Sequence, residues 1–283
     1  TKINAITLMT GAGLGIPILV SERNNPSRQP THPLWQLVLQ RLYRRAAAIV
    51  MQTKASLDEL PAEVRQRAVV IPNPITAAAH ATSSGSPTLV AVGRLLPQKG
   101  FDLLIRAFSL VAADYPDWRL VIWGEGDQRA TLESSVQSLG LDDRVSLPGL
   151  SDTPGQWMEG ASVFVLSSRF EGFPNVLGEA MAAGLPVAAF DCPFGPGEML
   201  HHDVDGLIVP NEDVEALAQA LRQLMADPVT RERLGNAARQ SAMRFNPDQI
   251  VEQWSKLVVG LLPSLSSSAI PNLRSEALTT PRR

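Results

Sequence analysis

The sequence has few residues that form disulfides or bind metals, with one cysteine and four histidines among 283 residues. Cys192 has no second thiol to pair with, and its apolar surroundings suit a reducing compartment, so the cytoplasm is the default location. The histidines have no metal-ligand spacing with carboxylates or with Cys192, and no metal site is predicted. They are His32, His80, His201 and His202.

The sequence also lacks an excess of either charge and a long apolar run. It contains 25 Lys and Arg against 28 Asp and Glu, a formal net charge of −3, so nucleic acid is not an expected partner. The nearest approach to a membrane span, residues 5–20, is interrupted by three glycines and a proline. No signal peptide is recognisable, and because the first residue is Thr we expect a fragment that has lost its start.

What is present is an ordinary globular composition, with 45% hydrophobic and 19% charged residues. The length is sufficient for two domains. Short apolar runs alternate with segments of helical periodicity such as 101–113 and 214–225, which predicts an α/β fold with doubly wound parallel sheets. The predicted strands are 16–21, 47–52, 88–93, 119–124, 144–149, 162–167, 186–191 and 206–210.

A proline-rich, small and polar stretch at 72–87 divides the chain. The segment before it is too short for a complete doubly wound domain and is predicted to be the second part of one. We therefore expect the first domain at 1–75, a linker at 76–87 and the second domain at 88–243. A terminal helix at 244–260 is expected to pack back toward the first domain, and the tail 261–283 is expected to be disordered.

The sharpest motif is SSRFEGFPNVLGEAMAAGLPV at 167–187. A strand is predicted to end at Ser167, and a helix to begin near Asn175 after a loop that carries Glu171. Free N–H groups at such a helix start bind phosphate, and Gly172 permits close approach of the backbone. Glu171 and Glu179, eight residues apart, would suit sugar hydroxyls on both sides of a phosphate group. The alternative from spacing alone is a helix capped by its own acidic residues.

The second motif is GRLLPQKGFDLL at 93–104, in which Gly93 closes a predicted strand. Arg94 follows directly, and Lys99 stands just before the next helix. Two cations at this position can neutralise a diphosphate, the alternative being ordinary solvated loop charge. GEGDQ at 124–128 is a third glycine-rich turn and gives weaker support. All three turns lie at carboxyl ends of strands, where open α/β sheets bind ligands.

Together these motifs, with LPG at 147–149, resemble the retaining glycosyltransferases of family 4 over residues 45–260. The resemblance implies the GT-B architecture of two facing Rossmann-like domains, the N-terminal one incomplete here. It implies that Arg94 and Lys99 bind the donor diphosphate, that Glu179 binds the ribose hydroxyls and that Glu171 faces the donor sugar. It also implies independence of metals. The backbone from Phe173 to Val176, including Asn175, would lie near the phosphate, and Gly93 and Gly172 are further donor-binding candidates.

The N-terminal part departs from the usual family pattern. Many members have a histidine-containing motif near residue 21, where this chain has the sequence VSERNNP. This sequence resembles that of family members of the bacterial polysaccharide or lipid-linked-oligosaccharide type. Glu22 and Arg23 are candidates for the interdomain cleft, the alternative being a structural ion pair. The family's first strands, which help to shape the acceptor site, are absent from the sequence.

One segment offers a candidate for membrane contact. HPLWQLVLQRLYRRAA at 32–47 places apolar residues beside Arg41, Arg44 and Arg45, which could touch an anionic membrane surface. The favoured reading is a helix packed on the core with a solvated basic face.

The resulting hypothesis is a retaining glycosyltransferase that moves a sugar from a nucleotide sugar, with UDP favoured by the resemblance, to a glycan or lipid-linked acceptor. The two alternatives are a noncatalytic module that binds nucleotide sugars and a nucleotide-sugar epimerase. The epimerase would need further acid and base residues that the sequence does not offer.

Overall fold

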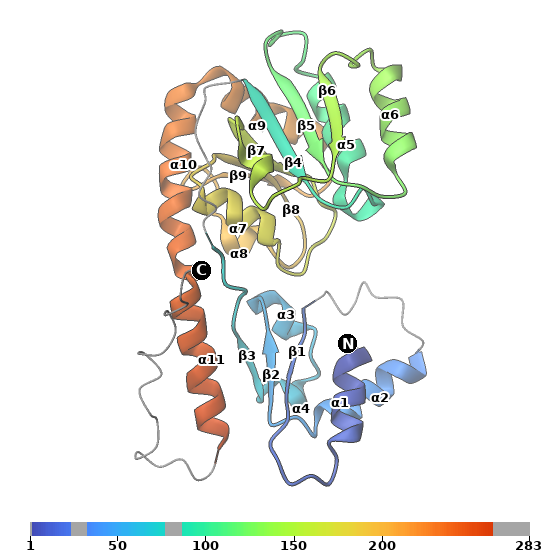
Figure 1. Cartoon of the computed structure of the whole chain (residues 1–283), viewed down its shortest axis with the longest axis vertical. Helices are drawn as coiled ribbons and strands as arrows, with labels where there is room; N and C mark the ends of the chain where they lie inside the picture. Colours follow the sequence, from blue (N-terminus) through green and yellow to red (C-terminus); the bar gives the residue numbers. More distant parts are fainter. Residues whose placement is uncertain (1, 24–32, 77–86, 263–283) are drawn as a thin grey trace, which may run out of the picture.

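The computed structural model describes residues 2–23, 33–76 and 87–262. These residues form two α/β halves that lie one above the other, as Figure 1 shows. Most of the predicted linker and of the predicted disordered tail, as well as His32 and His80, lie outside the described residues.

The N-terminal half contains a small parallel sheet with the strand order β1-β2-β3. The middle strand, β2, is buried at all four positions, as expected for a strand with neighbours on both edges and cover on both faces. The elements of this half are α1 (Lys2–Thr10), β1 (Leu19–Ser21), α2 (Pro33–Tyr43), β2 (Ala48–Met51), α3 (Lys54–Asp58), α4 (Ala62–Arg65) and β3 (Ala68–Val70).

The C-terminal half is larger and alternates strands with helices. Its strands are β4 (Thr88–Val92), β5 (Arg119–Trp123), β6 (Val145–Gly149), β7 (Val163–Leu166), β8 (Val187–Asp191) and β9 (Leu207–Pro210). Its α-helices are α5 (Phe101–Ser109), α6 (Arg129–Ser138), α7 (Asn175–Ala182), α8 (Pro196–Met199), α9 (Val214–Ala226) and α10 (Pro228–Ala242). Short 3₁₀ segments are Pro97–Lys99, Gln156–Met158 and Met243–Phe245.

The six strands of this half are parallel in the order β6-β5-β4-β7-β8-β9. The chain starts in the middle at β4, builds outward through β5 and β6, and then crosses to the other side at β7. The order therefore reverses between β4 and β7, which pair at Leu89 with Val163. In doubly wound sheets the crevice at such a reversal is where ligands bind.

Alternate strand residues pack into two separate cores. Leu89 and Ala91 of β4 join the core formed with α5, α6 and α9, whereas Val90 between them joins the core formed with α7 and α10. This alternation follows from the two-residue period of a strand. Both faces of the sheet are thus covered by helices, as a parallel sheet requires.

The helix α11 (Pro247–Leu261) connects the two halves. Its side chains Ile250, Trp254 and Leu257 pack against the N-terminal half, in a small core that includes Val50 and Ile71. Figure 1 shows α11 alongside the N-terminal sheet, continuing from α10 of the other half.

The eight strand predictions are all confirmed, each shortened by one to three residues at its ends. The strand β3 has no counterpart among those predictions. It is three residues long, lies at a sheet edge and leaves Val69 36% exposed, so its sequence lacks the continuous apolar run of a covered strand.

Candidate active site

The loops after β4 and β7 lie together at the strand-order reversal. The N–H of Arg169 donates to the carbonyl of Gln98 (2.8 Å), and the amide of Gln98 donates to the carbonyl of Phe170 (2.9 Å). The hydroxyl of Ser167 donates to the carbonyl of Lys99 (2.9 Å). These bonds join the two loops along their length, so the two motifs that the sequence singled out, about 70 residues apart, form one site.

Lys99 and Glu171 form an ion pair at the centre of this site. Lys99 Nζ lies 2.7 Å from Glu171 Oε1, and the two side chains are 16% and 8% exposed. The hydroxyl of the buried Ser168 donates to the same oxygen (2.6 Å). Glu171 Oε2 makes no hydrogen bond with any described residue, so one carboxylate oxygen remains available to a ligand.

Glycines let the loops at this edge of the sheet approach closely. The aliphatic chain of Lys99 crosses Gly93, where an added Cβ would lie 3.0 Å from Lys99 Cε. Gly124, with φ +140°, passes so near Gly93 that a Cβ there would lie 1.8 Å from the Gly93 carbonyl oxygen. A side chain at Gly124 would displace the backbone of Gly93, and one at Gly93 would crowd the side chain of Lys99.

Arg94 is exposed directly beyond Gly93. Its guanidinium makes no hydrogen bond or ion pair with any other residue that the structure describes. Because a guanidinium presents several donors in a fixed plane, this side chain remains able to bind a phosphate.

The start of α7 provides further donors. Its N-cap residue, Pro174, makes no side-chain capping bond, and the backbone N–H groups of Asn175 and Val176 have no hydrogen-bond partner among the described residues. The ring of Phe173 packs edge-on against that of Phe245 (5.5 Å between centroids), and Val176 packs on the core. These two residues therefore offer their backbone rather than their side chains, an arrangement typical of anion sites at helix starts.

Glu179 lies one turn further along α7 and is partly buried. Its carboxylate has no hydrogen-bond or ion-pair partner among the described residues. Burial raises the pKa of this carboxyl above its ordinary value. A carboxylate that is desolvated and without a partner is typical of a group placed for a ligand rather than for stability.

This placement predicts that Glu179→Gln stabilises the free protein at neutral pH. Because the pKa is raised on folding, the folded chain binds more protons than the unfolded chain above about pH 4.5, and stability falls there as pH rises. Removing the charge should raise Tm by about 1–3 °C at pH 7.5, since 1 kcal/mol corresponds to roughly 2–4 °C in a chain of this size. Thermal unfolding followed by circular dichroism measures it. The gain should vanish at pH 4 or below, and an equal gain at both pH values would contradict this account.

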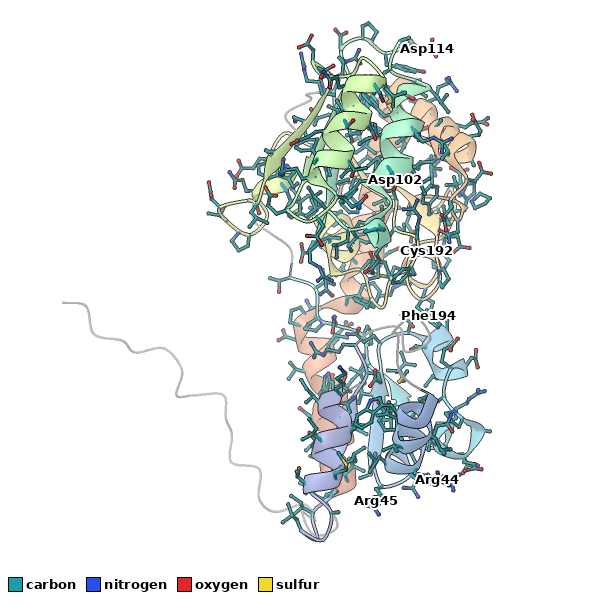
Figure 2. The ribbon with its side chains drawn as sticks, turned by 90° about the vertical axis from the view of Figure 1, so that its right-hand side faces the viewer. Arg44, Arg45, Asp102, Asp114, Cys192 and Phe194 are labelled. Carbon is teal, nitrogen blue, oxygen red and sulfur yellow. The ribbon has the colours of Figure 1, made fainter. Side chains whose placement is uncertain are left out.

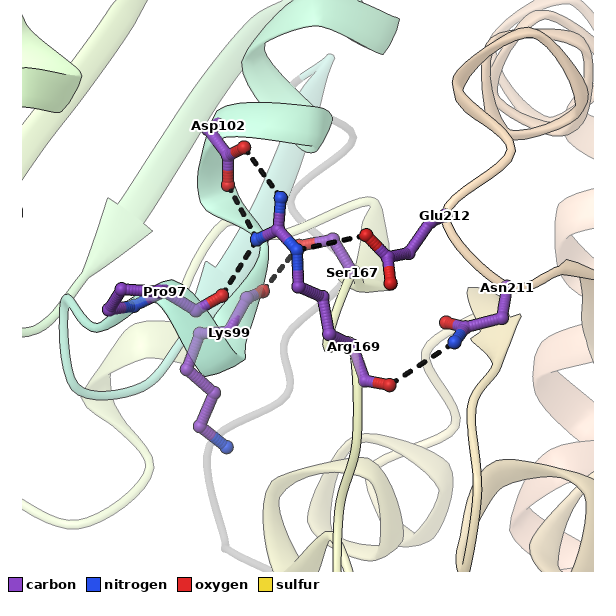
Figure 3. A network of polar contacts seen from close by, with 7 residues as sticks. All are labelled: Pro97, Lys99, Asp102, Ser167, Arg169, Asn211 and Glu212. Carbon is purple, nitrogen blue, oxygen red and sulfur yellow. Dashed lines mark hydrogen bonds and ion pairs between the residues drawn. The ribbon is translucent and has the colours of Figure 1, made fainter. Parts of the chain in front are cut away.

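Arg169, which the sequence motifs did not single out, holds three loops together at this edge, as Figure 3 shows. Its guanidinium donates twice to Asp102 (2.9 and 2.8 Å), once to the carbonyl of Pro97 (2.7 Å) and once to Glu212 (3.0 Å). Asn211 donates to the Arg169 carbonyl (3.2 Å). Burial raises the pKa of Asp102, but the hydrogen bonds and charge of Arg169 outweigh it and hold that pKa below its ordinary value.

Cys192 follows the end of β8 and is 3% exposed. Burial, followed by the negative charge of Glu171, raises the pKa of its thiol to about 12. The thiol therefore stays protonated at neutral pH and is a poor nucleophile.

Glu22 and Arg23 lie in the N-terminal half, after β1. Glu22 is 3% exposed and accepts hydrogen bonds from Asn4 (2.7 Å) and from the hydroxyl of Tyr43. Burial and the charge of Glu22 raise the pKa of Tyr43. Arg23 is exposed. The backbone of Glu22 is anchored to the carbonyl of Val50 (2.9 Å), and a role of either residue in the cleft stays a prediction.

The described residues offer neither a metal site nor a membrane-spanning helix. They contain no group of three or more His, Cys, Asp or Glu side chains arranged to hold a metal ion. Over the same part of the chain, every helix is too short or too polar to cross a bilayer.

Comparison with known proteins identifies the family. Residues 74–241 match the family described as glycosyl transferases group 1. The chain is 40% identical over 213 residues to an exopolysaccharide phosphotransferase of Streptomyces coelicolor, a match that covers 75% of this chain and 23% of that protein. It is 29% identical over 228 residues to an N-acetylgalactosaminyltransferase of Campylobacter jejuni whose acceptor is a saccharide carried on diphospho-undecaprenol, and the match covers 77% of this chain and 62% of that protein.

The chain therefore spans less than two thirds of the length of either relative.

The crystal structure of HepE from Anabaena in complex with UDP is similar in fold. It has a TM-score of 0.83 at 20% identity, over 92% of this chain and 76% of that one. This likeness confirms the predicted GT-B fold. Because the matched region exceeds half of the chain, the protein belongs to the group 1 glycosyl transferases.

Proposed function

We propose that the protein transfers a sugar from a UDP-sugar to a glycan or lipid-linked acceptor in bacterial polysaccharide or glycolipid synthesis, with retention of anomeric configuration. The observation that carries this proposal is the Lys99–Glu171 ion pair at the strand-order reversal, beside the uncapped start of α7. A cation, a carboxylate and free backbone amides at one edge of the sheet match the groups of a nucleotide sugar: diphosphate, sugar hydroxyls and ribose. The UDP in the HepE crystal structure supports the choice of nucleotide.

In this proposal the donor binds to the C-terminal half. The diphosphate lies between Lys99, Arg94 and the backbone of α7, and Glu179 accepts hydrogen bonds from the ribose hydroxyls. Glu171 Oε2 faces the sugar. The alternative in which these acidic residues merely cap a helix is disfavoured, because neither side chain bonds to the free amides of α7.

The chemistry required of these residues is electrostatic. As the bond between the sugar and the diphosphate breaks, negative charge grows on the leaving phosphate oxygen, where Lys99 and Arg94 stabilise it. An acceptor hydroxyl then attacks the same face of the sugar and passes its proton to the leaving phosphate oxygen, so the new bond retains the configuration. In this mechanism no side chain acts as a strong nucleophile, which agrees with the protonated state of the Cys192 thiol. The mechanism also requires no metal.

Incubation of the full-length protein with labelled UDP-sugars and candidate acceptors tests this function and separates it from its two alternatives. A transferase yields a labelled glycan or glycolipid, and NMR of the new linkage reports its anomeric configuration. An epimerase yields a second nucleotide sugar, and a noncatalytic module returns the donor unchanged. Either of these last two results, or an inverted linkage, would contradict the proposal.

We further propose that the N-terminal half touches the cytoplasmic face of an anionic membrane. The exposed face of α2 and the turn after it present two apolar and two basic side chains, those of Leu37, Val38, Arg41 and Arg45. Arg44 forms an ion pair with Glu63. Figure 2 shows Arg44 and Arg45 at the end of this half that lies away from the other half. Sedimentation with vesicles that contain phosphatidylserine should weaken when Arg41 and Arg45 are replaced by Glu, and unchanged sedimentation would reject this contact.

A further inference from the structure

Two polar contacts connect the N-terminal half to the segments on either side of Glu171. The first is made by Glu198 of α8, whose carboxylate accepts two backbone N–H groups of the other half. Lys54 N lies 2.7 Å from Oε2 and Ala55 N lies 2.7 Å from Oε1. These are the first two residues of α3, and they lie more than 140 residues away in the chain.

The contact completes the cap of α3. The first N–H groups of a helix have no partner inside the helix, and a negative charge is favourable there. Thr53, the N-cap residue, accepts the N–H of Ser56 (3.3 Å). Glu198 takes the two amides that Thr53 leaves free, so the cap of α3 is shared between the two halves of the protein.

The second contact reaches the start of α7. Asn73 donates to Asn175 Oδ1 (2.8 Å), and Gln52 donates in turn to Asn73. Asn175 is the first residue of α7, whose free backbone amides form part of the proposed donor site. A chain of three amide side chains thus runs from the end of β2 to this helix start.

Glu198 is itself held firmly in relation to Glu171. Arg244 donates to the carbonyls of Glu198 (3.0 Å) and Met199 (2.7 Å), which fixes the end of α8. The loop before α8 packs on the loop of Glu171, because the N–H of Glu171 donates to the carbonyl of Pro193 (3.3 Å). Gly195 in this loop leaves no room for a Cβ, which would lie 2.7 Å from Pro174. Figure 2 shows Phe194, next to Gly195, at the end of the C-terminal half that faces the other half.

We propose that Glu198 is a positioning residue: by capping α3 it holds the two halves in the closed orientation that transfer requires, and Asn73 adds a second link at α7. This inference rests on the proposed function for its catalytic consequence. Glu198 acts through α3 and the loop before α8, without touching the donor, so its loss should lower turnover and leave the affinity for UDP unchanged.

Hydrogen exchange of the backbone amides tests the contact without any substrate. In the wild-type protein the amides of Lys54 and Ala55 should be protected, and in Glu198→Ala both should exchange at least about tenfold faster. Glu198→Gln keeps one acceptor oxygen and should release one of the two amides. Asp227→Ala is the matched control, because Asp227 caps α10 within one half by accepting the N–H of Val229 (2.9 Å), and alanine has no acceptor to replace it. It should speed exchange at Val229 and leave Lys54 and Ala55 protected. Unprotected amides in the wild type, or unchanged exchange in both Glu198 variants, would overturn the proposal.

Steady-state kinetics of the full-length protein test the consequence. Glu198→Ala removes both charge-assisted hydrogen bonds to α3 and should lower kcat at least about tenfold, while Kd for UDP stays within about twofold. Asn73→Ala should act in the same direction, and Asp227→Ala should leave kcat unchanged. An equal loss of kcat and UDP affinity would make Glu198 a donor ligand and overturn the positioning role, as would an unchanged kcat. If the wild type transfers no sugar, the proposed function fails, yet the exchange experiment still decides whether Glu198 joins the halves.

Discussion

Lys99→Met is expected to lower kcat for sugar transfer by about 100- to 1000-fold, the largest effect we predict for one side chain. The substitution removes the ammonium group and keeps an unbranched chain to cross Gly93, so the loop should keep its shape. The charge of the leaving diphosphate is greater in the transition state than in the bound donor. Losing one preorganised partner of such a charge typically costs two to three orders of magnitude in rate, or about 2.7–4 kcal/mol.

The affinity for UDP should fall less, by about tenfold, since the bound donor already carries charge there but less of it. Lys256→Met provides the matched control. Lys256 also lies 2.7 Å from a glutamate, Glu252, but both side chains are exposed on α11. This pair should contribute little, and the control should behave as wild type. Near-normal turnover in Lys99→Met, with circular dichroism showing a folded protein, would reject the assignment of Lys99.

Glu171→Gln is expected to lower kcat by about 100-fold without weakening the binding of UDP. The amide keeps the size of the side chain and can still accept the hydrogen bond from Ser168, so the change is mainly one of charge. In the proposed site Glu171 faces the sugar, where positive charge develops as the bond breaks, and the carboxylate stabilises that charge. UDP carries no sugar in this position, so its affinity does not depend on this contact.

The affinity of Glu171→Gln for UDP should rise, because Lys99 loses its carboxylate partner and becomes free to bind the phosphate. Glu252→Gln is the control, since it removes the same charge from the exposed pair on α11. The two substitutions in the active site should also be non-additive in the double variant, because the side chains touch. A full loss of UDP affinity in Glu171→Gln would place this carboxylate at the nucleotide and contradict its assigned role.

The sequence was sufficient to predict the elements that carry the site. Strand β7 is apolar at every position and β4 at every position after Thr88, and Gly93 and Gly172 mark the loops that follow, so Lys99 and Glu171 could be placed at carboxyl ends of strands. Strand order then decided that these two ends are neighbours. The resemblance to a family implied that order, which local periodicity alone does not contain.

The long-range contacts that hold the site in place could not be predicted from the sequence. Arg169 follows a strand, as many solvated loop residues do. Its two hydrogen bonds to Asp102 depend on a contact between residues that lie 67 positions apart in the sequence. The cap that Glu198 gives to α3 spans more than 140 residues. Contacts of this kind depend on how the elements pack in three dimensions, and neither spacing nor composition marks the residues that make them.

The most direct test of the central claim, that the C-terminal half holds a nucleotide diphosphate at Lys99, Arg94 and α7, is a calorimetric titration of this 283-residue chain with UDP. All the proposed donor residues lie after residue 90, so the chain should bind UDP with measurable heat, and UDP should raise its Tm. Lys99→Met should weaken this binding about tenfold, and Lys256→Met should not. No heat and no thermal stabilisation at millimolar UDP in a folded chain would contradict the account.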